Sequence, residues 1–192
     1  SMGLKPGDKV AILAKNSAEW LLTDIAIAMA GMISVPIYPT ASVQTIRYIL
    51  EHSEASAVFI GKLDEPDVVA DAIPVNLSSI AFPYPTVPCR YDWNSLIEKY
   101  PPIEVLPEPD PDDVMTILYT SGSTGKPKGV VLSYHAYAYG SMEARDTVDV
   151  NTDDHLLSSL PLAHVTERTV TAGPAIYAGT RCSFVESLMT FQ

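Results

Sequence analysis

The chain has 192 residues, is 47% hydrophobic and carries a formal net charge of −11 at pH 7, which allows one domain with a buried core and disfavours nucleic acid as a partner. Its two cysteines, Cys89 and Cys182, have no metal-ligand spacing, and no secretory leader is recognisable. We therefore expect a cytoplasmic setting, with any membrane contact limited to the periphery of the membrane's inner face.

The first sixty residues alternate between short apolar runs and amphipathic stretches. The apolar runs predict buried strands over residues 10–14, 33–38 and 55–60. Helices are expected over residues 17–30 and 43–52. Asn16 and Glu19 have the spacing of a capping box before the first helix, and Gly31 is suited to end it. The helical residues expected to face the core recur at helical spacing: Leu21, Leu22, Ile25, Met29, Val43, Ile46, Ile49 and Leu50. This alternation indicates right-handed crossovers and a parallel sheet covered on both faces.

The run over residues 25–46 is uncharged and is long enough to suggest a membrane span, which needs about 20 apolar residues. Gly31, Pro36 and Pro39 interrupt it, and proline breaks a helix because it lacks a backbone N–H. We therefore expect a helix end, a turn and a buried strand in this run.

Residues 62–113 are rich in proline, and acids outnumber bases there. Ten of the sixteen prolines fall between Pro66 and Pro111. Little continuous helix or central strand is expected as a result, apart from a short helix over residues 92–100. The chain is accordingly divided into three predicted parts: a βαβαβ part over residues 1–61, a proline-rich acidic connector over residues 62–113 and a part over residues 114–192 that carries the loop described next.

Residues 119–130 read Tyr-Thr-Ser-Gly-Ser-Thr-Gly-Lys-Pro-Lys-Gly-Val and join an apolar run to a β-branched one. Glycines let the backbone approach an anion with its N–H groups, hydroxyls donate further hydrogen bonds, and lysines supply positive charge. No acidic residue occurs over residues 114–142, so the surroundings are locally positive. The stretch predicts a phosphate-binding loop.

The loop differs from that of kinases and GTPases, where a helix begins directly at the lysine. Here Pro127 pushes Lys126 toward extended geometry. We expect a strand after the loop, and only then a helix that Ser133 caps and that runs to about Thr147. A serine- and glycine-rich linker is the structural alternative, but linkers lack lysines bounded by strand signals. The order of elements favours a lid over phosphates.

His164 lies in the sequence Leu-Pro-Leu-Ala-His-Val-Thr-Glu-Arg, after a strand-like run over residues 155–160 that Pro161 ends. Open α/β sheets bind ligands at the carboxyl ends of their strands. On residue type alone, a single histidine beside apolar residues is more often structural than functional. Glu167 and Arg168 are expected to pair with each other or with solvent.

The unbroken run from Thr120 to Lys128 resembles the signature of the adenylate-forming superfamily, which includes acyl-CoA synthetases, firefly-type luciferases and peptide-synthetase adenylation domains. Pro-Leu-Ala-His-Val followed by Glu-Arg is similar to the long-chain fatty acyl-CoA synthetases, as is Leu-Lys-Pro-Gly-Asp-Lys-Val near the start. The resemblance implies an α/β fold with a partly parallel sheet and flanking helices. The chain would be an incomplete N-terminal portion of the acyl-CoA synthetase-like fold.

The same resemblance implies a site for ATP, Mg²⁺, coenzyme A and a carboxylic acid. The implied nucleotide-binding residues are Thr120, Ser121, Gly122, Ser123, Thr124, Gly125, Lys126 and Lys128. Four of these would surround the β and γ phosphates: Ser121, Ser123, Thr124 and Lys128. Thr124 would also lie near the Mg²⁺ ion of MgATP, and His164 would be the catalytic-site residue that borders the acyl-adenylate.

The implied reaction activates a carboxylic acid, a long-chain fatty acid by the closest resemblance, to acyl-AMP and then forms a thioester with coenzyme A. The family's motifs for adenine, for ribose and for the catalytic lysine come later than Gln192. We therefore expect the remainder of the chain as a necessary partner and the isolated chain to be inactive. Three alternatives stay open: an aryl-acid, amino-acid or luciferase-like adenylating enzyme, a non-catalytic truncated nucleotide-binding module, and a P-loop phosphotransferase.

Overall fold

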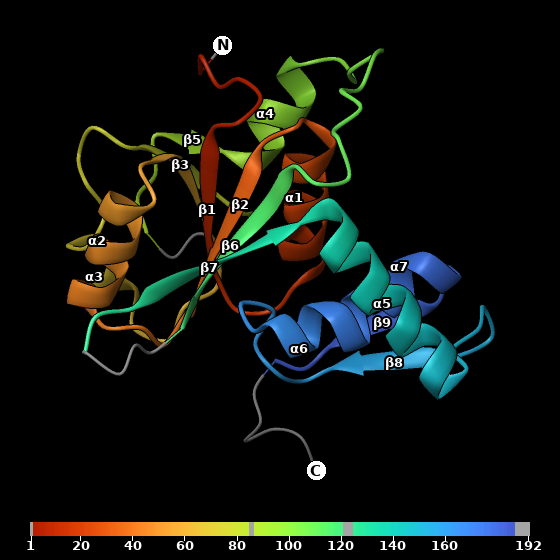
Figure 1. The fold of residues 1–192 in the computed structure, drawn as a ribbon. Helices are drawn as coiled ribbons and strands as arrows, with labels where there is room; N and C mark the ends of the chain where they lie inside the picture. Colours follow the sequence, from red (N-terminus) through yellow and green to blue (C-terminus); the bar gives the residue numbers. More distant parts are fainter. Residues whose placement is uncertain (1, 85–86, 121–124, 187–192) are drawn as a thin grey trace.

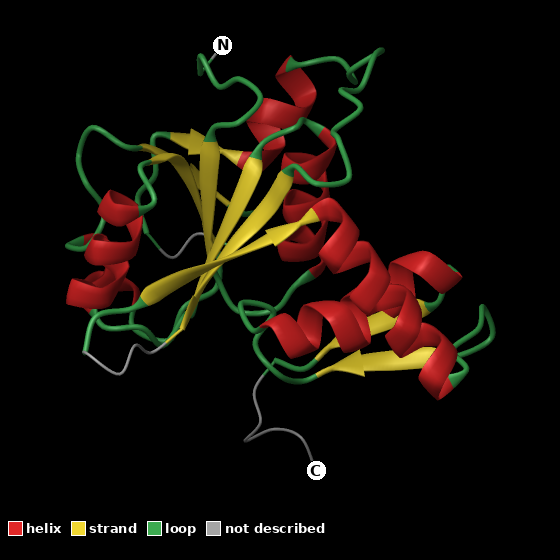
Figure 2. Cartoon of the chain, in the orientation of Figure 1, coloured by secondary structure: helices red, strands yellow, loops and turns green. Residues whose placement is uncertain are grey.

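A computed structural model describes residues 2–84, 87–120 and 125–186. Seven strands form its main sheet: β1 (Lys9–Leu13), β2 (Ile33–Ile37), β3 (Ala55–Ile60), β4 (Ser78–Ala81), β5 (Tyr91–Asp92), β6 (Val114–Thr120) and β7 (Lys128–Ser133). Their order across the sheet is β5-β4-β3-β1-β2-β6-β7 (Figures 1 and 2). Neighbouring strands are parallel except β6 and β7, which are antiparallel. The predicted α/β class with a partly parallel sheet is confirmed.

Helices flank this sheet: α1 (Ala18–Met29), α2 (Val43–His52), α3 (Pro66–Ala70), α4 (Trp93–Lys99), α5 (Tyr134–Val148), α6 (Val165–Glu167) and α7 (Gly173–Ala178). A π-helical turn, η1 (Arg168–Ala172), connects α6 to α7. Strands β8 (His155–Ser158) and β9 (Arg181–Phe184) form a separate parallel pair. Figure 1 shows α1 and α2 on opposite faces of the main sheet, with α5 to α7 and the β8–β9 pair gathered at one side of it.

The main sheet is buried on both faces because alternate residues of a strand point to opposite sides. On one side, Leu13 of β1 shares a core with Ile46 of α2. On the other, Ile12 of the same strand packs in a core with Trp20 of α1. All four side chains are fully buried, as expected for a central parallel strand.

The strands and helices predicted over the first sixty residues agree with the structure to within one residue at each end. The uncharged run over residues 25–46 contains the end of α1, a turn at Gly31 with φ +68° and strand β2. None of the helices in the described part of the chain has both the length and the apolar character needed to cross a bilayer.

The predicted cap of α1 is wrong, and its core face was predicted only in part, since Leu21 packs against the core and Ile25 is half-buried. Ser17 caps the helix, since its side chain accepts a hydrogen bond from the Trp20 N–H at 3.2 Å. Leu22 and Met29 are exposed, whereas Asp24 is buried. The helix turns this face inward because the Asp24 carboxylate pairs with a buried arginine from a distant part of the chain, and a stripe of apolar residues cannot reveal that partner.

The described part of residues 62–113 contains little central strand, as expected, namely the four residues of β4. β4 lies between β3 and β5 and pairs in parallel with both. Its four residues contain no proline, and Pro74 and Pro83 lie outside it on either side, so the prolines delimit the strand and do not break its ladder. The expected short helix is confirmed as α4, which Asp92 caps. The division into three parts stays a prediction.

Candidate functional site

The predicted phosphate loop connects the antiparallel strands β6 and β7. Thr120, at the end of β6, is the Cα partner of Lys128, at the start of β7. Gly125 has φ +83°, a left-handed conformation that glycine adopts without strain. Ser121, Gly122, Ser123 and Thr124 lie outside the described residues. The predicted order of strand, loop, strand and helix is confirmed, and the chain is extended after Pro127, which contradicts the kinase-type alternative.

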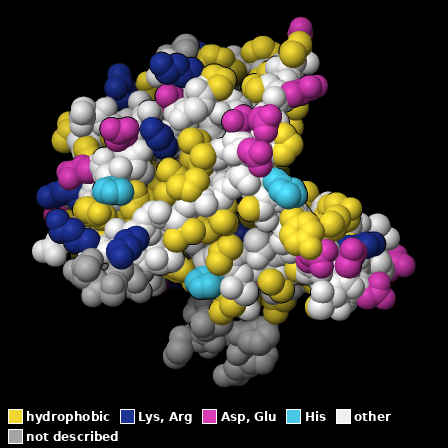
Figure 3. All heavy atoms as spheres, viewed as in Figure 1, with side chains coloured by type: hydrophobic (Ala, Val, Ile, Leu, Met, Phe, Trp, Pro, Cys, Tyr) yellow, Lys and Arg dark blue, Asp and Glu magenta, His cyan; other side chains and the backbone are white. Residues whose placement is uncertain are grey.

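Two lysines at the carboxyl-terminal end of the loop carry positive charges that are accessible from solvent. Lys126 and Lys128 are exposed, and neither ammonium group forms an ion pair with any residue that the structure describes. Figure 3 shows Lys and Arg side chains gathered near α2 and the start of β7. Positive charge without an internal partner is suited to binding an anion from solution.

His164 lies between β8 and α6 and is the N-cap residue of α6. Its ring Nδ1 accepts a hydrogen bond from the Thr166 N–H at 3.1 Å. An accepting Nδ1 is unprotonated, so the neutral ring carries its proton on Nε2. The ring also lies edge-on to the ring of Tyr38, with centroids 6.5 Å apart. These two contacts fix the orientation of an exposed imidazole.

A cavity of about 520 Å³ brings His164 and the loop together. Its lining residues come from the segment between β2 and α2, from α2, from the end of β6, from the loop and from the segment before α6: Tyr38, Ala41, Thr45, Ile49, Tyr119, Thr120, Gly125, Pro127 and His164. Three predicted site residues, Thr120, Gly125 and His164, therefore share one cavity. Lys126 and Lys128 are adjacent to it in the chain but do not line it.

Two tyrosines line this cavity that sequence reasoning missed. Burial raises the pKa of both Tyr38 and Tyr119, and the neighbouring Tyr48 contributes for Tyr119. The Tyr119 hydroxyl lies 2.8 Å from Nδ1 of His52. Tyr38 follows β2 and Tyr119 is near the end of β6, and the carboxyl ends of neighbouring parallel strands meet at one edge of a sheet. That rule, applied to both strands, is the signal that could have found them.

Glu167 and Arg168 do not pair with each other or with solvent, contrary to expectation. Both side chains are buried. The Glu167 carboxylate accepts a hydrogen bond from the Ser159 N–H at 3.0 Å, whereas Arg168 pairs with Asp24. A partner 144 positions away in sequence gives no local pattern from which to predict it.

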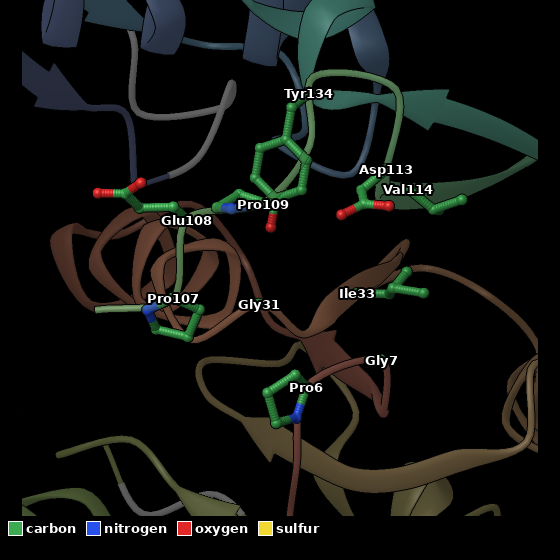
Figure 4. A pocket seen from close by; sticks show the side chains of 10 residues that line it. All are labelled: Pro6, Gly7, Gly31, Ile33, Pro107, Glu108, Pro109, Asp113, Val114 and Tyr134. Atoms are coloured by element: carbon green, nitrogen blue, oxygen red, sulfur yellow. The ribbon is translucent and has the colours of Figure 1, made fainter. Parts of the chain in front are cut away.

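A second cavity, of about 430 Å³, lies at the opposite, amino-terminal end of β1, β2 and β6. In Figure 4, Tyr134 and Asp113 lie across it from Pro6 and Pro107. Glu108 is a further lining residue, and the lining that the structure describes contains carboxylates but no lysine or arginine. A triphosphate would be repelled there, so the cavity at His164 is the candidate site.

Comparison with known proteins shows the family to which the chain belongs. A family model described as AMP-binding enzyme matches residues 1–191. The chain belongs to this family. The AMP-binding chain is 32% identical over 202 aligned residues to fatty acyl-CoA synthetase A of Dictyostelium discoideum, covering 98% of the chain and 30% of that relative. It is 31% identical to the peroxisomal long chain acyl-CoA synthetase 6 of Arabidopsis thaliana, covering 97% of the chain and 29% of the relative.

Among solved structures, ATP-bound MatB from Rhodopseudomonas palustris superposes on the AMP-binding chain with a TM-score of 0.82 at 25% identity, over 97% of the chain and 37% of MatB. The AMP-binding chain thus spans 29–30% of the length of the two synthetases that it matches. The resemblance recognised in the sequence is confirmed at the level of the family.

Proposed function

We propose that this chain is the phosphate- and acid-binding part of an ATP-dependent acid–thiol ligase, called here the parent enzyme. The observation that carries the proposal is the shared cavity, which His164 lines together with Thr120, Gly125 and Pro127 of the loop over residues 120–128. The names of the relatives, which are fatty acyl-CoA synthetases, support a long-chain fatty acid as substrate.

The described residues fit an ATP triphosphate in three respects. Lys126 and Lys128 carry charge that no described carboxylate neutralises. A Cβ built on Gly125 meets no atom of the described residues within 4 Å, its chain neighbours aside, so the backbone there is open to a ligand on the described side. The adjoining cavity, at about 520 Å³, is in the range of small-molecule sites. Mg²⁺, with Thr124 nearby, would shield the triphosphate charge.

The proposed chemistry begins when a carboxylate oxygen attacks the α-phosphorus of ATP. The bond from that phosphorus to the bridging oxygen breaks, and pyrophosphate leaves. The loop's N–H groups, its hydroxyls and Lys128 would stabilise the charge that builds on the departing pyrophosphate. His164 would shape the space where the carboxylate meets the α-phosphate. The thiol of coenzyme A then attacks the acyl carbon, loses its proton to solvent and releases AMP.

Carboxylate-dependent exchange of labelled pyrophosphate into ATP tests this proposal on the parent enzyme. The acids to compare are palmitate, benzoate and the amino acids. We expect exchange to be fastest with palmitate and to require Mg²⁺. If exchange is fastest with an aryl acid or an amino acid, that class of acid replaces the long-chain fatty acid as the proposed substrate. If the parent enzyme binds ATP but shows no exchange with any acid, it is a non-catalytic nucleotide-binding module. The proposal that it is a ligase would then be wrong.

A further inference from the structure

The fully buried ion pair between Arg168 and Asp24 connects two separate parts of the fold. Arg168 is 0% exposed and Asp24 is 1% exposed. Nη2 of Arg168 lies 2.9 Å and 2.6 Å from the two carboxylate oxygens of Asp24. Asp24 lies on α1, against the main sheet, whereas Arg168 begins η1, directly after the short helix that His164 caps.

The same guanidinium also contacts the two strands that border the candidate site. Nη1 donates to the Thr116 hydroxyl of β6 at 3.0 Å, and Nη2 lies 3.3 Å from the Ser34 hydroxyl of β2. Ser34 and Thr116 are Cα partners between these strands, and their hydroxyls are 3.0 Å apart. Arg168 therefore binds at the junction of the strand that leads to Tyr38 and the strand that leads to Thr120.

On its other side, Arg168 is bound to the segment that carries His164. The Arg168 N–H donates to the His164 carbonyl at 3.3 Å, so one helical turn separates the two residues. The Arg168 carbonyl accepts a hydrogen bond from the Tyr137 hydroxyl at 3.1 Å. The Tyr137 ring of α5 also lies 5.1 Å from the guanidinium carbon, at a distance typical of a cation–π contact.

Stability alone is a weak reason for such an arrangement. Removing two charges from water is costly, and replacing a buried ion pair with apolar residues of similar volume is often neutral or stabilising. Nε of Arg168 has no hydrogen-bond partner in the described part of the chain, so desolvation of the guanidinium is not fully compensated. The guanidinium group is, however, planar and carries several N–H donors, so it fixes the angle between the groups that it binds.

We propose that Arg168 is a positioning residue that holds α6, and with it His164, at a fixed distance from β2 and β6 and therefore from Tyr38 and Thr120. The kinetic part of this inference rests on the proposed function. The geometric part does not, because it concerns only where the His164 ring lies.

The test uses three variants of the parent enzyme. In the double variant Asp24→Leu/Arg168→Met, apolar side chains replace the pair, which preserves packing but removes the bonds to Ser34 and Thr116. Thr116→Val keeps the ion pair but removes the hydroxyl that joins Arg168 to β6, together with the hydrogen bonds of that hydroxyl to Ser34. Glu167→Gln is the matched control, because its side chain is equally buried and its amide oxygen can still accept the Ser159 N–H.

Crystal structures give the first readout, which needs no activity. We expect the contact between the His164 and Tyr38 rings to be lost in the double variant and loosened in Thr116→Val, with the sheet and the melting temperature maintained. If the double variant does not fold, the positions of the His164 and Tyr38 rings in Thr116→Val decide the test. Ring positions unchanged from wild type in the folded variants would overturn the inference.

Pyrophosphate exchange gives the second readout. We expect kcat to fall up to about 100-fold in the double variant, the scale of a small misplacement of a reacting group, with the KM for MgATP nearly unchanged and Glu167→Gln like wild type. An unchanged kcat would contradict the inference. If the wild type shows no exchange with any acid, the proposed function fails, and the crystal structures still decide whether Arg168 positions His164.

Discussion

Lys128 carries the charge that the proposed adenylation needs most directly. It is exposed, it forms no ion pair with the described residues, and strand pairing places it across from Thr120. In the parent enzyme we expect Lys128→Ala to slow adenylate formation by on the order of 100-fold, the scale seen when one donor to a developing oxyanion is removed. Binding of the fatty acid should weaken far less, because the lysine acts on the departing pyrophosphate.

Rapid-quench kinetics and fatty-acid titration measure these two quantities separately. Lys99→Ala is the control, because Lys99 is equally exposed but lies on α4, and no cavity residue comes from that helix. Equal losses of rate and of fatty-acid affinity in Lys128→Ala would count against the assigned role.

Tyr137 makes the stability of the chain depend on pH in the alkaline range. Burial raises its pKa to about 12, whereas an unperturbed tyrosine has a pKa near 10. The unfolded chain therefore loses this proton first, so the stabilising contribution is complete below about pH 10 and declines between about pH 10 and 12. Tyr137→Phe loses the hydrogen bond to the Arg168 carbonyl and should be less stable by about 1 kcal/mol at pH 7.

Urea unfolding of both proteins from pH 7 to 12 checks this prediction. The advantage of wild type over Tyr137→Phe should be constant up to about pH 10 and then shrink by at most roughly 1.4 kcal/mol per pH unit. An advantage that grows as the pH rises toward 10 and then levels off would show that the phenol has a lowered pKa, opposite to the structure.

At the scale of elements, the close approach of η1 and α7 to α5 depends on a residue without a side chain. A Cβ built on Gly173 would lie 2.1 Å from Oγ and 2.5 Å from Cβ of Ser141, closer than atoms can pack. We expect Gly173→Ala to destabilise the chain by about 1–3 kcal/mol and Ser141→Gly to restore part of that loss. Chemical denaturation measures both effects.

Gly140→Ala provides the contrast, on the helix that carries Ser141. The nearest atom to a Cβ at Gly140 is Cγ2 of Thr169, at 3.8 Å, which is ordinary contact. Alanine should therefore stabilise α5 by roughly 0.5–1 kcal/mol, because glycine is a poor helix former. Similar destabilisation in both alanine variants would argue against close packing as the cause.

Sequence reasoning succeeded for elements whose signals are local. Strands β1 to β3 and helix α2 followed from local apolar patterns, a strand was predicted on either side of the loop where β6 and β7 lie, and Ser133 was recognised as the cap of α5, where it accepts the Ala136 N–H at 3.2 Å. The buried face of α1 was missed because Asp24 is buried only by pairing with Arg168. The π-helical turn η1 was not predicted. The site was predicted in part: the loop and His164 were recognised, but Tyr38 and Tyr119 reach it only through the order of the strands.

At the scale of the whole molecule, the candidate site lies between two parts of the fold. The main sheet provides Tyr38 and Thr120, and the smaller α5–α7 and β8–β9 part provides His164. The chain spans 29–30% of the length of the synthetases that it matches. We therefore expect the 192-residue chain to show no carboxylate-dependent pyrophosphate exchange alone. Turnover comparable to that of the parent enzyme would contradict this expectation.

The most direct test of the account is a crystal structure of the parent enzyme with Mg²⁺ and a non-hydrolysable ATP analogue. We expect the β and γ phosphates to contact residues 120–128, Lys128 included, and the α-phosphate to lie in the cavity that His164 lines. A triphosphate bound elsewhere, with residues 120–128 free of contact, would contradict the account.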